Sequence, residues 1–153
     1  MSDLGRFIEA QADRCAAALA ELRAGAKRTH WIWFILPQLR GLGTSPLAER
    51  YGIASLDEAR SYLAHPLLGP RLIECVQALL AHRGRSAAAM LGALDALKLR
   101  SCLTLFARAA PGEGSFDQAL QQFFGGVPDA LTLRLLDQAD AGIDGAACGS
   151  PEG

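Results

Sequence analysis

The sequence lacks an excess of charge of either sign: 15 basic residues stand against 16 acidic ones, for a formal net charge of −1. Proteins that work on DNA or on an anionic membrane carry a clear surplus of lysine and arginine. The sequence also lacks a long apolar run, since the longest, residues 31–37, is far shorter than the ~20 residues that span a bilayer. We therefore expect neither nucleic acid nor a membrane as a partner. The N-terminal residues are polar and show no leader pattern, so the cytoplasm is the expected compartment.

Metal and cofactor motifs are missing as well. The four cysteines lie far apart, with no CxxC pair and no Cys–His spacing typical of zinc: Cys15, Cys75, Cys102 and Cys148. The sequence contains no GxxxxGKS, GxxxxGKT, GxGxxG, HExxH or GxSxG string. We therefore expect no metal and no cofactor, and we interpret the cysteines on apolar helix faces as small core residues.

What the sequence does contain is a succession of short amphipathic segments. Its 153 residues fit one domain, and half of them are apolar, as in an ordinary globular protein. Apolar stripes at helical spacing predict a helix over residues 4–23 and further helices that begin near residues 46, 56, 70, 87, 96, 116 and 130. Six residues are expected to act as N-caps: Ser45, Ser55, Ser86, Asp95, Ser115 and Asp129. We predict an all-α, single compact domain of about six to eight short helices over residues 1–139, followed by a flexible acidic and Gly-rich tail over residues 140–153.

One segment, residues 31–36, is apolar at every position, so periodicity cannot separate a buried helix from a buried strand. Thr29 can cap a helix at this point, and the rest of the chain is helical, which favours the helix. We expect this Trp-rich segment to be buried, with Trp31 and Trp33 as core residues. The alternative is that their rings stack on a base or ring of a ligand.

Polar residues suited to a binding site lie beside this apolar run and along one predicted helix. His30 and Gln38 bracket the run, at the core boundary where pockets usually form, although plain hydrogen bonding to the backbone would also explain them. Four polar residues share about a third of a helix circumference: Lys98, Ser101, Thr104 and Arg108. An ammonium and a hydroxyl three residues apart suit a phosphate or carboxylate, and a solvated outer face is the alternative.

Lysine is scarce, with Lys27 and Lys98 standing beside thirteen arginines. In such an Arg-biased sequence a lysine can indicate the need for a compact amine, although chance also explains two.

Four strings carry a resemblance to a known family: KRTHWIWFILPQLRGLGTS at 27–45, SLDEARSYLAHPLLGPRL at 55–72, LKLRSCLTLF at 97–106 and FDQALQQFFGG at 116–126. They resemble the bacterial domain of unknown function 1810, over residues 4–136. The patterns HWxWFxxPQ and KLxSxxTLF are the specific ones. The resemblance implies a mainly helical single domain and supplies no established activity. Members are often labelled calpastatin, but a calpastatin-type inhibitor is a disordered chain, whereas half of these residues are apolar.

The resemblance and the residue patterns single out overlapping positions. The candidate catalytic residues are His30 and Lys98, and the candidate ligand-binding residues are Gln11, Trp31, Trp33, Gln38, His65, Ser101 and Thr104. The resemblance adds Gly41 and Gly43, which lie in a predicted loop.

We predict that Gln11, His30, Gln38, Lys98 and Ser101 converge in one cleft between the first helix, the Trp-rich segment and the Lys98 helix. Lys98 would neutralise a small anionic ligand such as a nucleotide or phosphosugar. His30 would carry protons near neutral pH, which would allow hydrolysis or transfer. The alternative is a non-catalytic regulatory or protein-interaction module with an apolar groove beside residues 41–45. The sequence indicates no particular protein partner.

Overall fold

The computed structural model of the chain describes the backbone of residues 3–148 and the side chains of residues 3–139. Within that part the chain forms ten helices: α1 (Gly5–Ala12), α2 (Cys15–Ala24), α3 (Ile32–Ile35), α4 (Pro46–Tyr51), α5 (Leu56–Ala64), α6 (Leu68–Leu80), α7 (Ala87–Leu91), α8 (Ala93–Ala109), α9 (Gly114–Phe124) and α10 (Ala130–Cys148). The only extended pairing there is an isolated parallel bridge between Leu39 and Ile53. The all-α class is therefore confirmed. None of these ten helices is both long enough and apolar enough to cross a membrane.

The segment predicted as one helix over residues 4–23 forms two helices, which is one reason why ten helices replace the expected six to eight. A turn at Asp13 and Arg14 separates α1 from α2. The buried residues of the two helices are Phe7 and Gln11 with Arg6 in α1, and Ala18 and Leu22 in α2. Four of them, at positions 7, 11, 18 and 22, would share one face of an unbroken helix as well. Apolar spacing therefore cannot reveal the break.

The Trp-rich segment forms α3, a single helical turn inside the core. Trp31, Ile32 and Leu36 are each no more than 1% exposed. Leu36 leaves helical geometry, with φ −125° and ψ 69°, because it precedes Pro37 and the proline ring disfavours the α region there. The helix expected for this run is confirmed, although it is only one turn long.

Four predicted N-caps accept the backbone N–H three residues on, at 2.9–3.1 Å: Ser45, Ser55, Ser86 and Asp129. The other two predicted caps were wrong. Ser115 lies within the first turn of α9 and donates its hydroxyl to Glu113. Asp95 lies within the first turn of α8, because the helix begins directly after Gly92. Gly92 has a φ of 92°, a backbone conformation that glycine adopts readily. The Asp95 carboxylate is therefore available to side chains.

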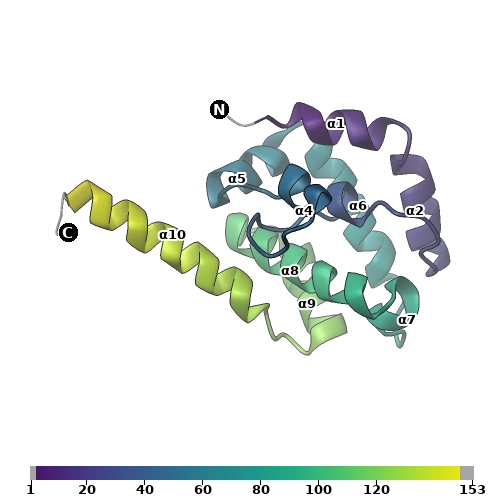
Figure 1. The fold of residues 1–153 in the computed structure, drawn as a ribbon. Coiled ribbons are helices and arrows are strands. Elements are labelled where there is room, and N and C mark those ends of the chain that lie inside the picture. Colours follow the sequence, from purple (N-terminus) through teal and green to yellow (C-terminus); the bar gives the residue numbers. More distant parts are fainter. Residues whose placement is uncertain (1–2, 149–153) are drawn as a thin grey trace.

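Helix α8 is the centre of the packing. It contacts α5, α7, α9 and α10, while α6 packs against α2, α5 and α9 (Figure 1). A series of buried aromatic rings, Phe7, Tyr62, Phe106 and Phe116, runs from α1 through α5 and α8 to α9, with successive centroids 5.1, 5.5 and 5.7 Å apart. The core therefore extends from the first helix to the ninth through α8.

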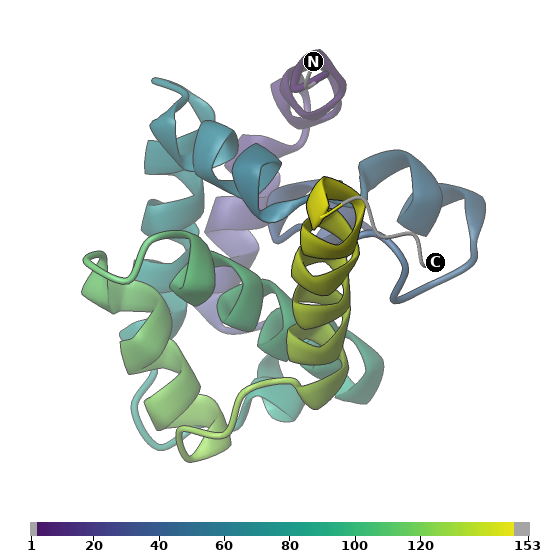
Figure 2. The ribbon, with the colours of Figure 1, turned by 90° about the vertical axis from the view of Figure 1, so that its left-hand side faces the viewer.

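Helix α10 projects away from the other helices over much of its length (Figure 1), and in Figure 2 it points toward the viewer. Its first turns pack on α8 and bury Thr132 and Leu136. The flexible tail expected over residues 140–153 concerns side chains that lie outside the described part. The backbone is helical as far as Cys148, and flexibility stays a prediction.

Candidate functional site

A cavity of about 520 Å³ opens between α3, the loop that follows it, α4, α8 and the start of α10. It is lined by Trp33, Gln38, Leu42, Gly43, Thr44, Ser45, Ala48, Leu94, Leu97, Lys98, Ser101, Asp129 and Leu131. Four of these were predicted site residues: Trp33, Gln38, Lys98 and Ser101. The structure thus brings together residues that are far apart in the sequence, and we call this space the Lys98 cavity.

Lys98 gives the cavity its cation. The Nζ atom lies 3.2 Å from Oδ1 of Asp95 and 5.0 Å from the ring centroid of Trp33. The side chain is 29% exposed, so the ammonium is held by two contacts and remains open to solvent. Ser101, one turn further along α8, donates its hydroxyl to the carbonyl oxygen of Leu97 at 3.2 Å. Its oxygen lone pairs can still accept a hydrogen bond.

Asp95 joins Lys98 to the other lysine of the chain. Nζ of Lys27 lies 2.9 Å from Oδ2 of Asp95 and 5.1 Å from the ring centroid of Trp31. The Lys27 side chain is only 8% exposed. Each lysine therefore pairs with one tryptophan ring, and both share one carboxylate. Two ammonium groups and one carboxylate leave a positive charge behind this wall of the cavity.

Gln38 reaches the cavity from the loop after α3, and its backbone is fixed by Ile53. The Ile53 amide donates to the carbonyl of Gln38 at 2.9 Å, and the Arg40 amide donates to the carbonyl of Ile53 at 2.8 Å. The chain then turns at Gly41, whose φ of 104° favours glycine. This turn brings residues 42–45 back to form the opposite rim of the cavity.

Asp129 lines the cavity as the N-cap of α10. Its Oδ2 accepts hydrogen bonds from the amide and the hydroxyl of Thr132, at 2.9 and 2.6 Å, and the positive end of the helix dipole offsets its charge. The Asp129 amide donates to Oγ1 of Thr104 at 2.8 Å, and this hydroxyl donates to the carbonyl of Arg100. Thr104 therefore fastens α10 to α8 and is not among the lining residues. The described residues contain no group of three or more His, Cys, Asp or Glu side chains placed to hold a metal ion.

Gln11 joins helices in the core instead of lining the cavity. It is 1% exposed, and its Nε2 donates to the carbonyl of Phe34 at 2.7 Å and to Oη of Tyr62 at 2.9 Å. Its Oε1 accepts from Arg71 at 3.2 Å. These bonds tie α1 to α3, α5 and α6. The convergence predicted for Gln11 and Lys98 is therefore not observed, because apolar spacing shows which face of a helix is buried and not which neighbour covers it.

Trp31 is fully buried, as expected from the sequence, and its indole Nε1 donates to Oε1 of Glu21 at 2.9 Å. The same carboxylate accepts from the amides of Arg28 and Thr29 and from the Thr29 hydroxyl. Partial burial raises the pKa of Glu21, but these hydrogen bonds outweigh it and lower the pKa to about 2. Glu21 thus organises the turn that leads into α3.

The two remaining histidine candidates lie outside the Lys98 cavity. Nδ1 of His65 accepts from the amides of Leu67 and Leu68, at 3.1 and 3.3 Å, and so satisfies two backbone donors at the start of α6. His30 is exposed and is not among the residues that line the cavity. The predicted catalytic pair of His30 and Lys98 is therefore not assembled in this structure.

Two features of the cavity were missed from the sequence. Asp95 was interpreted as a helix cap, although its i,i+3 spacing to Lys98 was a signal that the two side chains could pair. The sequence analysis expected an apolar groove beside residues 41–45 but did not name the leucines of this cavity, because helical spacing does not show which apolar side chains stay exposed. These are Leu94, Leu97 and Leu131.

Comparison with known proteins places the chain in a family. A family model described as Protein of unknown function (DUF1810) matches residues 1–136. The chain belongs to this family. It is also similar to the conserved hypothetical protein Rv1873 from Mycobacterium tuberculosis, whose crystal structure shares 52% sequence identity and a TM-score of 0.87, over 88% of this chain and 96% of that one. A comparison with curated proteins found no match.

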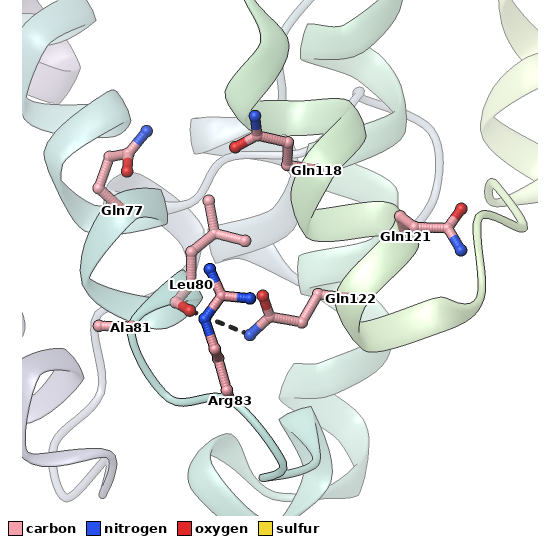
Figure 3. A pocket seen from close by; sticks show the side chains of 7 residues that line it. All are labelled: Gln77, Leu80, Ala81, Arg83, Gln118, Gln121 and Gln122. Carbon is pink, nitrogen blue, oxygen red and sulfur yellow. Dashed lines mark hydrogen bonds between the residues drawn. The ribbon is translucent and has the colours of Figure 1, made fainter.

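This DUF1810 protein also has a larger cavity, of about 650 Å³, between α6 and α9. Its lining is mostly amide-bearing: Gln77, Leu80, Ala81, Arg83, Gln118, Gln121 and Gln122 (Figure 3). Gln122 donates to the carbonyl of Leu80 at 3.1 Å, and Gln121 points away from the space between the helices. The single charged group, Arg83, is exposed. We favour the smaller Lys98 cavity as the functional site because it holds a fixed cation beside a hydroxyl and an amide.

Proposed function

We propose that this DUF1810 protein binds a small anionic ligand in the Lys98 cavity. Lys98 supplies the positive charge, and Ser101 and Gln38 supply hydrogen-bonding groups. The observation that carries the proposal is that these three side chains line one cavity of about 520 Å³, a volume in the range of small-molecule sites. Nucleotides and phosphosugars carry an anionic group of the required kind and are the first probes.

Lys98 is suited to this role because its position is fixed before a ligand arrives. The bond to Asp95 and the ring of Trp33 restrict the ammonium, which reduces the entropy lost on binding. Lys27 already neutralises the Asp95 carboxylate from its other oxygen. An incoming phosphate or carboxylate can therefore gain a charge-assisted hydrogen bond from Lys98 without leaving Asp95 unpaired.

The proposed activity is binding and not chemistry. The hydroxyls in the lining, Thr44, Ser45 and Ser101, have no histidine beside them, since none of the lining residues is a histidine. A neighbouring histidine is a common activator of a hydroxyl nucleophile, and the lining does not supply one. We keep the cytoplasm as the proposed compartment, because Cys75 and Cys102 are buried free thiols, as is usual where thiols stay reduced.

A thermal-shift screen tests the proposal with nucleotides, phosphosugars and small carboxylic acids. A ligand at about 100 times its Kd should stabilise the wild type by about 2.7 kcal/mol, a shift of several degrees. The shift should vanish in Lys98→Met, which leaves Asp95 paired with Lys27 and should still fold. Arg83→Met, which removes a cation from the larger cavity, is the matched control and should keep the shift. If the shift is lost in Arg83→Met and kept in Lys98→Met, the ligand binds in the larger cavity and not in the Lys98 cavity.

A further inference from the structure

The mouth of the Lys98 cavity exposes an unusual amount of apolar surface. Six large apolar side chains are exposed in the described part of the chain, and three of them line this cavity: Leu94, Leu97 and Leu131. Leu94 is 74% exposed and Leu97 is 58% exposed. Single exposed leucines are common, but a cluster at a binding cavity indicates a surface that a ligand or partner covers.

The apolar and polar groups follow each other along α8. Leu94, Leu97, Lys98 and Ser101 are spaced i, i+3, i+4 and i+7, and therefore share one face of the helix. Leu131 approaches the same cavity from the start of α10. A ligand that lies along this face meets leucine side chains at one end and the ammonium and hydroxyl at the other.

The ring of Trp33 does not offer a free face beside Lys98. The ammonium lies 5.0 Å from the ring centroid, so it occupies the position that a stacked base would take on that side. The apolar part of a ligand anchored at Lys98 therefore has the leucines as its contact surface. Aliphatic chains suit such a surface better than flat aromatic rings, which gain most from stacking.

We propose that the ligand of the Lys98 cavity is an unbranched aliphatic carboxylate. Its carboxylate accepts hydrogen bonds from Lys98 and from Ser101, whose hydroxyl turns toward it from the carbonyl of Leu97. Its hydrocarbon chain covers Leu94, Leu97 and Leu131. This inference rests on the proposed function, and it names the ligand class. The positive charge behind the cavity wall complements the carboxylate, and the volume of about 520 Å³ lies in the range of small-molecule sites.

Isothermal titration of the full chain with acetate, butyrate, hexanoate and octanoate, below their micellar concentrations, tests the inference. Affinity should rise about two- to fourfold for each methylene that reaches the leucines, as expected for partial to full burial of a CH₂ group. Octan-1-ol, which has the chain without the charge, should bind at least tenfold more weakly than octanoate. Equal affinity for octanol and octanoate would overturn the inference.

Two variants separate the chain from the head group. The double variant Leu94→Ser/Leu97→Ser should flatten the dependence on chain length, and because both leucines are exposed it should fold like the wild type. Leu67→Ser removes an exposed leucine that does not line the cavity and should leave the dependence unchanged. Lys98→Met should lower the affinity for every acid, while the affinity should still rise with the length of the hydrocarbon chain.

Three other results would overturn the inference in distinguishable ways. If inorganic phosphate and all four acids bind with equal affinity and only Lys98→Met abolishes binding, the leucines do not bind the hydrocarbon chain of the ligand. The inference is then contradicted, and the proposed binding of a small anion is supported. If no acid, phosphate or nucleotide binds, both fall. If sedimentation velocity shows wild-type self-association that Leu94→Ser/Leu97→Ser abolishes, a second copy covers the leucines and no aliphatic ligand is needed.

Discussion

Lys27 and Lys98, the only two lysines of the chain, contact the two oxygens of one carboxylate, that of Asp95. The Lys27 side chain is 8% exposed and the Lys98 side chain 29%. Lys27 therefore anchors the carboxylate from the protein side, while Lys98 presents its charge to the cavity. Each ammonium also lies over an indole ring, which attracts the cation.

Asp95→Asn should destabilise the protein by about 1–3 kcal/mol, because Lys27 then loses the charged partner of a nearly buried ammonium. Urea denaturation at neutral pH measures this as a lower midpoint with an unchanged m-value. Asp57→Asn is the control, since its pair with Arg60 is solvent-exposed and such pairs contribute about 0–1 kcal/mol. Equal losses in the two variants would contradict an anchoring role for Asp95.

Gln11→Ala should reduce the free energy of unfolding by about 2–3 kcal/mol and leave anion binding intact. The substitution removes the hydrogen-bond partner of the Phe34 carbonyl and the Tyr62 hydroxyl, both deep in the core. Thermal unfolding and titration of the same sample report the two effects. Gln118→Ala, at an exposed position, should change neither. Loss of anion binding in a folded Gln11→Ala variant would contradict the structural role and indicate that Gln11 contributes to the binding site.

Glu21→Gln should make the free energy of unfolding less dependent on pH at acid pH. The pKa of Glu21 is about 2 in the folded chain, below its ordinary value of 4.5, because four hydrogen bonds favour the carboxylate. Its contribution to stability is therefore complete above about pH 4.5 and is lost as the pH falls toward 2. The free energy of unfolding, measured by urea denaturation from pH 7 to pH 2.5, should fall more steeply in the wild type than in the variant.

Glu58 also has a lowered pKa, because hydrogen bonds from Arg6 and Ala54 outweigh the effect of burial. It is unchanged in Glu21→Gln, so the difference between the two curves isolates Glu21. Parallel curves for wild type and variant would contradict the assignment of that acid sensitivity to Glu21.

His65→Ala should cost about 1 kcal/mol, the usual loss when a side-chain acceptor at a helix start is removed. His65→Asn should recover most of this, because an Asn side chain can accept from the amide two residues on. Chemical denaturation of the three proteins measures both effects, and anion binding should be the same in all. A selective loss of ligand binding in His65→Asn, with stability retained, would instead indicate direct contact with the ligand.

The fold could be predicted further than the site, and particular elements show why. Serine caps at Ser45, Ser55 and Ser86 mark helix starts with local chemistry that needs no distant partner. The break between α1 and α2 left no trace, because the buried residues keep the same helical phase on both sides of the turn. Local sequence signals therefore predict the starts of helices well, but they predict the breaks between consecutive helices poorly.

The same limit explains the site. Helical spacing correctly grouped Lys98 with Ser101, since both belong to one face of one helix. The carbonyl of Gln38 is held by the Ile53 amide, and the Asp95 carboxylate is held by Lys27; helical spacing encodes neither contact. His30 stands next to the buried Trp31 in sequence and yet is exposed, and the apolar run gives no sign of this change between neighbours.

The two tryptophans differ in exposure, so the intrinsic tryptophan fluorescence of the protein can report binding in the cavity. Trp31 has no exposed surface, whereas Trp33 lines the Lys98 cavity beneath the ammonium. Indole emission responds to nearby charge and to water, so a bound anion alters the emission of one ring and leaves the other as an internal reference. Occupancy of the cavity can thus be followed in the unlabelled protein by fluorescence, with quenching by iodide confined to the accessible ring.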